Sequence, residues 1–218
     1  MQQVGRKTRS SRKEIAYSQL KHQIITGELT AGMPLVEHEL SEKYDISRTP
    51  IREILHRLSH EGLVDMYPNK GAFVKTLTPK DLSDIFQLRE AIEGMASRLA
   101  SQYEDKSTIQ EIRLKLLALD VNHSPIDAAE GVKVGKSLHD FIASSSGNSL
   151  LYKSYIEVSA QAALVRSLTQ SSIEIEQHSY TEHLAIIDAL QRSDMRDSEE
   201  AMRKHLRMTY KRILETLH

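Results

Sequence analysis

The stretch from Ser47 to Leu58 constrains the fold of this chain more than any other part of its sequence. Its apolar side chains recur at helical spacing and form one stripe that can be buried: Ile51, Ile54, Leu55 and Leu58. Ser47 can cap this helix, because its hydroxyl can accept a hydrogen bond from an amide of the first turn. Pro50 lies close to the start, where its missing N–H costs nothing. The sequence therefore predicts one amphipathic helix here.

The exposed first turn of this helix carries side chains that proteins use to contact DNA. Ser47, Arg48, Thr49 and Arg52 remain at its N-terminal, solvent-facing end. A recognition helix presents its N-terminal residues to base edges and phosphates in the major groove. The planar guanidinium of arginine matches guanine or a phosphate with two hydrogen bonds. An ordinary surface helix would have the same apolar stripe, so the neighbouring segments must decide between the two interpretations.

Two further helices are predicted before this one. The first covers residues 13–26, and a turn-rich link with two glycines and a proline follows over 27–35. A short second helix over 36–44 leads through a tight turn at residues 45–46 into the helix described above. The order of helix, short turn and helix is typical of the helix-turn-helix motif of DNA-binding proteins.

A β-hairpin is predicted directly after the helix-turn-helix. Residues 63–67 alternate as a strand does, residues 68–71 have the composition of a turn, and residues 72–75 form the second strand. Lys70 makes the tip basic, and the flexible Gly71 beside it would let it reach a phosphate or the minor groove. The hairpin could instead only close the small domain, but its position after the helix-turn-helix favours a wing.

The charge of the chain is distributed unevenly. Residues 1–80 contain 13 Lys and Arg against 9 Asp and Glu, whereas residues 81–218 contain 16 against 21. This asymmetry indicates that only the N-terminal part meets a polyanion. Residues 1–12 are polar and basic, and we expect a disordered tail that either follows a phosphate backbone or has no role.

A second domain is predicted from residue 78 onward, because Thr78 can cap a helix that has Pro79 at its first position. The chain thus divides into a tail (1–12), a winged helix-turn-helix domain (13–77) and a helical domain (78–218). Helical periodicity covers 81–103, 107–119, 126–145, 150–169, 171–190 and 193–217. The first of these helices is expected to bury one apolar face: Leu82, Ile85, Leu88, Ile92 and Leu99. The predicted fold is mainly α, with a small β-hairpin wing and an all-α antiparallel bundle of six or seven helices.

The composition excludes several classes of site and location. The chain has no cysteine, which rules out disulfides and thiolate metal sites. Its apolar runs stay far below the roughly 20 residues of a membrane helix, and no secretory signal is visible. We therefore expect a cytoplasmic protein that does not interact with membranes.

The N-terminal motifs resemble those of the GntR superfamily of winged-helix repressors. They are GELTAGMPL at 27–35, LSEKYDISRTPIREILHRLSHEGLV at 40–64 and PNKGAFV at 68–74. The resemblance implies that Arg48, Thr49 and Arg52 contact operator DNA, as do Lys70 and Gly71 at the wing tip. His38 opens the second helix, where some members of the superfamily carry an arginine, so a phosphate contact there would depend on pH.

The helical part resembles the FadR-type C-terminal (FCD) ligand-binding domain. The residues that carry this resemblance are LREAIE at 88–93, HDFIASSSGN at 139–148, EHLAIIDAL at 182–190 and AMRKHL at 201–206. In that family three helices each supply one histidine to a metal site, and an aspartate one turn before the first histidine completes it. The resemblance implies that His139, His183 and His205 are the three histidines. The aspartate position is Gly135.

The residues themselves agree with a site for Zn²⁺ or Ni²⁺. Each histidine lies on an otherwise apolar helix face, and three imidazoles from three helices can converge on one cation. The alternative is that they are ordinary core histidines. Because Gly135 supplies no carboxylate, we expect the metal to be bound weakly or not at all. A bound acid effector or water would then take the vacant position, or the histidines would bind an anionic effector directly.

Two arginines are further candidates for effector binding. Arg89 stands four residues before Glu93, which fits a surface ion pair, whereas the family resemblance implies that Arg89 turns inward toward a carboxylate effector. Arg166 stands among apolar residues, where a charge needs a partner or an anionic ligand or reaches the surface along its own stem.

The sequence as a whole predicts a transcriptional regulator that represses by binding a palindromic operator in double-stranded DNA as a homodimer. A small organic acid in the helical domain would change its affinity for the operator. The alternatives are a three-histidine metalloenzyme and a DNA-binding protein without an effector. The enzyme is disfavoured because no recognisable general-base motif accompanies the histidines, and we expect no enzymatic activity.

Overall fold

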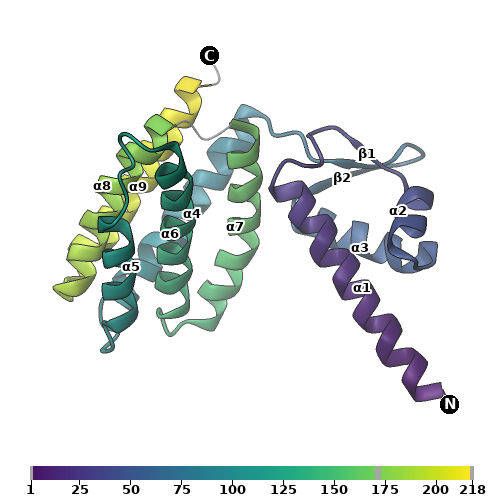
Figure 1. The fold of residues 1–218 in the computed structure, drawn as a ribbon, viewed down its shortest axis with the longest axis horizontal. Helices are drawn as coiled ribbons and strands as arrows, with labels where there is room; N and C mark the ends of the chain where they lie inside the picture. Colours follow the sequence, from purple (N-terminus) through teal and green to yellow (C-terminus); the bar gives the residue numbers. More distant parts are fainter. Residues whose placement is uncertain (1, 170–172, 217–218) are drawn as a thin grey trace. The chain divides into compact units, whose positions relative to one another are not determined.

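The computed structural model describes residues 2–169 and 173–216. The chain forms two compact units (Figure 1). The first unit comprises Met1–Pro79 together with Ala160–Leu168, and the second comprises Lys80–Ser159 together with Thr169–His218. This division assigns residues 149–159 of one long helix, α7 (Ser149–Thr169), to the second unit and Ala160–Leu168 of the same helix to the first.

The first unit consists of helices and a small sheet, together with part of α7. Its elements are α1 (Gln2–Ile25), β1 (Pro34–Leu35), α2 (Glu37–Tyr44), α3 (Arg48–His60), β2 (Val64–Tyr67) and β3 (Gly71–Val74). The strands form an antiparallel sheet in the order β1-β3-β2, with Pro34 opposite Phe73 and Val64 opposite Val74. The predicted helix-turn-helix and wing are therefore confirmed.

Two parts of the first unit differ from the expectation. Helix α1 begins at Gln2, whereas we expected residues 1–12 to be a tail without secondary structure. Gln, Arg and Lys are good helix formers, so this polar segment continues the helix that follows it. The link over 27–35 contains the additional strand β1, which pairs with β3. A strand of two residues is too short to produce an alternating pattern in the sequence.

The apolar stripe of α3 is the centre of the core of the first unit. Ile51, Ile54, Leu55 and Leu58 are at most 1% exposed, and they pack with residues of α1 and of the sheet. The backbone of Ser47 has the extended conformation of an N-cap, but its hydroxyl makes no capping hydrogen bond, so that detail of the prediction is wrong. The buried stripe therefore fixes α3 while its first turn stays at the surface.

The second unit is a bundle of helices. Besides α7 it contains α4 (Pro79–Ala100), α5 (Ser107–Leu117), α6 (Pro125–Ser144), α8 (Ile173–Gln191) and α9 (Met195–Thr216). Helix α8 packs against α5, α6 and α9, and its Ile186 and Ile187 lie fully buried in the aliphatic core. Along the described chain, no helix has both the length and the apolar character needed to cross a membrane.

The buried face of α4 differs from the predicted one. Leu88 is 51% exposed, and Ile92 is only half-buried. Arg89 and Glu93 are buried instead. A pattern based on apolar residues misses this face, because two opposite charges that pair with each other can also be buried.

Candidate functional site

The first turn of α3 presents its polar side chains to solvent. Ser47, Arg48, Thr49 and Arg52 are all exposed. Arg52 is held by Glu37 of α2, whose two carboxylate oxygens accept hydrogen bonds from Nε at 2.8 and 2.7 Å. Such an exposed pair contributes little to stability, but it orients the guanidinium at the surface of the helix-turn-helix. In the part of the chain that the structure describes, no carboxylate pairs with Arg48.

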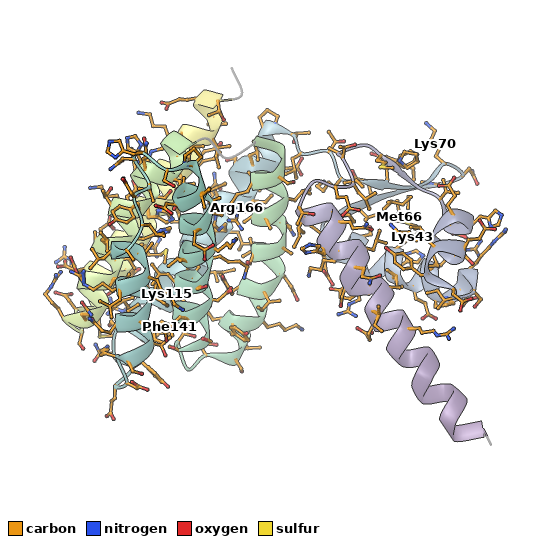
Figure 2. The ribbon with its side chains drawn as sticks, in the orientation of Figure 1. Lys43, Met66, Lys70, Lys115, Phe141 and Arg166 are labelled. Carbon is orange, nitrogen blue, oxygen red and sulfur yellow. The ribbon has the colours of Figure 1, made fainter. Side chains whose placement is uncertain are left out.

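The wing tip is another exposed basic position of the first unit. Lys70 lies between β2 and β3 and points away from the sheet (Figure 2), and Gly71 is the first residue of β3. The turn requires a left-handed backbone at Asn69 (φ 62°) and at Gly71 (φ 93°), which a glycine adopts without steric cost. His38 on α2 is also exposed and lies 3.6 Å from Glu42. The residues predicted to contact DNA are thus accessible, with Arg52 and His38 next to carboxylates.

Three histidines converge inside the second unit. His139 comes from α6, His183 from α8 and His205 from α9, and one ligand nitrogen of each lies within 4.8 Å of the others. Their ring centroids are 4.6 to 5.4 Å apart, and all three side chains are buried. The structure therefore brings together the histidines that the sequence singled out.

Two of these histidines each contact a glutamate of their own, and each glutamate accepts hydrogen bonds from an arginine. His139 Nδ1 contacts Glu93 Oε2, and Glu93 Oε1 accepts a hydrogen bond from Arg89 Nε at 2.6 Å. His205 Nδ1 lies 2.8 Å from Glu182 Oε2. Both oxygens of Glu182 accept hydrogen bonds from Arg212, at 2.5 and 3.2 Å. A carboxylate on Nδ1 favours the tautomer with its proton there, which leaves Nε2 as the ligand atom.

The charges of these groups follow from their surroundings. Burial alone would raise the pKa of Glu93, but the positive charge of Arg89 and the contact with His139 hold it well below its usual range. The pKa of Glu182 is also lowered, because His205 and Arg212 outweigh the opposing effect of burial. Burial lowers the pKa of His205 to about 4, although Glu182 acts in the opposite direction. At neutral pH, His205 is therefore a neutral imidazole in front of a charged carboxylate.

Gly135, at the position of the family's aspartate ligand, lies against the ring of His183. A Cβ atom at residue 135 would be 2.4 Å from Cε1 and 3.0 Å from Nδ1 of that imidazole. One turn earlier, a Cβ atom at Gly131 would be 2.7 Å from Oε1 of Glu176. The two glycines thus let side chains of α8 lie against the backbone of α6. Gly135 not only lacks a carboxylate but also provides the space for His183.

The two candidate effector arginines lie in different surroundings. Arg89 and Glu93 do form an i,i+4 pair, but their side chains are only 8% and 2% exposed, so the surface location is wrong and the inward orientation is observed. Arg166 is half-buried on the part of α7 that belongs to the first unit (Figure 2). The three histidines belong to the second unit.

The sequence did not reveal the carboxylates that orient the histidines. The spacing of four residues pairs Glu93 with Arg89 only, and no motif links Glu182 or Arg212 to the histidines. Glu182 precedes His183 in the sequence but contacts His205, and contacts between separate helices leave no periodic signal. The one available hint was the position of Glu182 and Arg212 next to apolar stretches on their helices.

Comparison with known proteins gives the family of the chain. Residues 12–74 match the family described as "Bacterial regulatory proteins, gntR family", and residues 84–208 match the FCD domain. An uncharacterized HTH-type transcriptional regulator in an unstable DNA locus of Streptomyces ambofaciens is 30% identical, over 93% of this chain and 84% of that protein. The HTH-type transcriptional repressor RspR of Escherichia coli is 26% identical, over 87% of this chain and 83% of that protein.

A solved structure agrees at the level of the fold. E. coli McbR/YncC superposes with a TM-score of 0.77 at 19% identity, over 95% of this chain and 99% of that one. The relatives are transcriptional regulators and not enzymes, so the metalloenzyme alternative loses its support. The chain belongs to the GntR family of bacterial transcriptional regulators and combines a winged helix-turn-helix with an FCD domain.

Proposed function

We propose that this regulator is a repressor whose affinity for its operator is changed by a small organic acid bound at the histidine cluster. The observation that carries the effector part is the convergence of three buried imidazoles, two of which are oriented by buried or half-buried glutamates. Burying so many ionisable groups is costly for a module that only dimerises, and it is typical of sites that bind a charged ligand.

The DNA part of the proposal rests on the exposed residues of the first unit. Arg48, Thr49 and Arg52 at the start of α3 would contact base edges and phosphates, and Ser47 would contact a phosphate. Lys70 and Gly71 would reach the backbone or the minor groove from the wing tip. His38 would add a phosphate contact when protonated. A homodimer would place two such units on the halves of a palindromic operator, in the cytoplasm.

The residues of the cluster fit a divalent cation. One nitrogen of each imidazole would hold Zn²⁺ or Ni²⁺, and the metal would supply a positive centre for a carboxylate. Gly135 contributes no charge, so the balancing negative charges are those of Glu93 and Glu182 behind the imidazoles. We therefore expect weaker binding than at a site with a fourth, carboxylate ligand. The carboxylate of an effector would fill the open position, with Arg89 as a nearby positive charge.

The proposed regulation is a shift between two dimer geometries. An effector that binds one geometry better stabilises it, and effector and operator then weaken each other reciprocally. If no carboxylate changes operator affinity, the chain is a DNA-binding protein without an effector, and the bundle serves only for dimerisation.

The operator is first identified by selecting bound sequences from random DNA duplexes. A binding assay with this operator then tests both the DNA part and the effector part of the proposal. We expect Arg48→Ala and Arg52→Ala each to weaken selective binding by about 1–3 kcal/mol, while Lys115→Ala, at an exposed position of α5 (Figure 2), has no effect. A panel of small carboxylates is then added with and without Zn²⁺. Unchanged selectivity in both arginine variants contradicts the DNA part, and unchanged operator affinity across the panel contradicts the effector part.

A further inference from the structure

A groove of about 340 Å³ lies between α8 and α9 on the second unit. Ile175 and His178 line it from α8, and Met208, Lys211, Arg212 and Glu215 line it from α9. Ile175 is buried and Met208 half-buried, so the groove has an apolar part. Lys211 and Arg212 add two positive charges beside it. An apolar surface with a few convergent polar groups is the usual composition of a small-molecule site.

The two cations of the groove differ in how they are held. Lys211 is exposed, and its closest carboxylate, Glu215, is 4.0 Å away, a distance at which an exposed pair contributes little. Arg212 is mostly buried, with 14% of its side chain exposed, and it forms two hydrogen bonds with Glu182. A ligand carboxylate could therefore interact with a flexible ammonium group and with one edge of a fixed guanidinium.

Arg212 also connects the groove to the histidine cluster. Its partner Glu182 accepts the hydrogen bond from His205 Nδ1 at 2.8 Å. A carboxylate that binds Arg212 from the groove competes with Glu182 for the same guanidinium. A weaker hold on Glu182 in turn changes the hydrogen bond that orients His205.

We propose that the α8–α9 groove binds a small amphipathic carboxylate and that Arg212 and Glu182 transmit this binding to His205. The apolar body of the ligand lies against Ile175 and Met208, and its carboxylate faces Lys211 and Arg212. The site is separate from the effector position proposed among the three imidazoles, and it does not depend on that proposal.

The acidic groups around the groove limit its affinity for an anion. Glu215 on the rim and Glu182 behind Arg212 oppose an anion, so the groove is close to neutral overall. We expect a dissociation constant on the order of 1 mM for a small probe. Replacing Glu215 by Gln removes one of the opposing charges and should tighten binding about twofold to fivefold.

Benzoate is a suitable probe, with the neutral benzamide as its control. In the full-length protein labelled with ¹³C at its methionine methyl groups, benzoate should shift the methyl signal of Met208, assigned through Met208→Leu. Met33 of the first unit serves as the internal reference. Lys211→Met should weaken the affinity for benzoate about fivefold, and Glu215→Gln should increase it. An unmoved Met208 signal at about 20 mM benzoate, equal effects of benzamide, or an unchanged response in Lys211→Met would overturn the proposal.

The transmission to His205 is tested by the ¹⁵N signals of its imidazole. Benzoate should shift them in the natural protein, and in Lys211→Met the same shift should need about fivefold more benzoate, which separates binding in the groove from binding at the histidines. Arg212→Lys keeps the charge but cannot hold both oxygens of Glu182, so the response of Met208 should persist while that of His205 is lost. A Met208 shift without any His205 shift in the natural protein would overturn the transmission. His139→Ala, which disables the proposed effector site, should leave the Met208 response intact.

Discussion

The imidazole of His183 occupies the space into which any side chain at residue 135 would extend, with Cε1 only 2.4 Å from the ideal Cβ position of Gly135. This contact joins α6 to α8 at the level of the histidine cluster. Gly135 therefore has two effects: it supplies no carboxylate to the cluster, and it leaves room for the ring of His183. A side chain at this position would act on the cluster through packing before it could act as a ligand.

Gly135→Ala should displace His183 and weaken Zn²⁺ binding. Alanine normally stabilises a helix by about 1 kcal/mol relative to glycine, but crowding in a packed interior costs about 1–3 kcal/mol, so we expect a net loss of stability. Chemical denaturation and zinc titration measure the two effects. Gly94→Ala on α4 is the matched control, because its Cβ would meet the flexible side chain of Arg203. If both variants changed stability and zinc affinity equally, Gly135 would not be needed to make room for His183. For the same reason, Gly135→Asp should not create a tight four-ligand site.

Glu182→Gln should reduce metal affinity without removing a ligand atom. The amide is neutral, so it orients His205 less firmly and no longer balances the charge of Arg212 or of a bound cation. Loss of such a supporting carboxylate typically costs about 10–100-fold in metal affinity. Competition with a coloured zinc chelator measures the change. Glu200→Gln, which removes an exposed partner of Arg207, is the control and should leave the affinity unchanged, and a matching loss there would mean that overall charge is responsible.

The stability of the metal-free protein should fall as the pH is lowered from about 6.5 toward 4. Burial lowers the pKa of His205 to about 4 in the folded chain, whereas an unfolded histidine titrates near 6.5. Between these values the unfolded state binds more protons, so the free energy of unfolding decreases with falling pH. Urea denaturation at several pH values in the presence of a chelator measures the slope. His205→Gln should have a shallower slope in this window, and an unchanged slope would show that other groups dominate.

A second contribution should appear at lower pH. Arg89 and His139 hold the pKa of Glu93 well below its usual range, against the effect of burial. A carboxyl whose pKa is lowered by folding stabilises the protein fully above its unfolded value and loses that stabilisation as the pH falls below it. Glu93→Gln should therefore reduce the acid sensitivity below about pH 4.5, measured by the same denaturation series. Glu37→Gln, which removes a half-exposed carboxylate, should change it far less.

Lys70→Ala should weaken operator binding by a similar factor for all sequences. Lys70 is exposed at the wing tip, where an ammonium group contacts phosphates without reading bases. The slope of log affinity against log salt concentration should decrease in magnitude by about 1. Fluorescence anisotropy over a salt series measures this slope. Lys115→Ala, at an exposed position of the second unit, is the control, and a loss restricted to one operator sequence would indicate base recognition instead.

The sequence predicted the elements of this fold well wherever the signal was local. The apolar stripe of α3, the turn at the wing tip and the start of α4 at Pro79 follow from periodicity and turn chemistry. Strand β1 was missed because two residues carry no period. Leu88 was predicted to be buried but is exposed, because the buried face of α4 includes the ion pair of Arg89 and Glu93.

By itself the sequence determined which segments form helices, and its motifs indicated the family and the three histidines. Only the tertiary structure decided what lies behind two of the three histidines: Glu93 with Arg89 at His139, and Glu182 with Arg212 at His205. The physical reason is that helical periodicity specifies which face of a segment is buried but not which residue of another helix it meets. The register between packed helices depends on the shapes of all their side chains together, and that register placed His183 against Gly135.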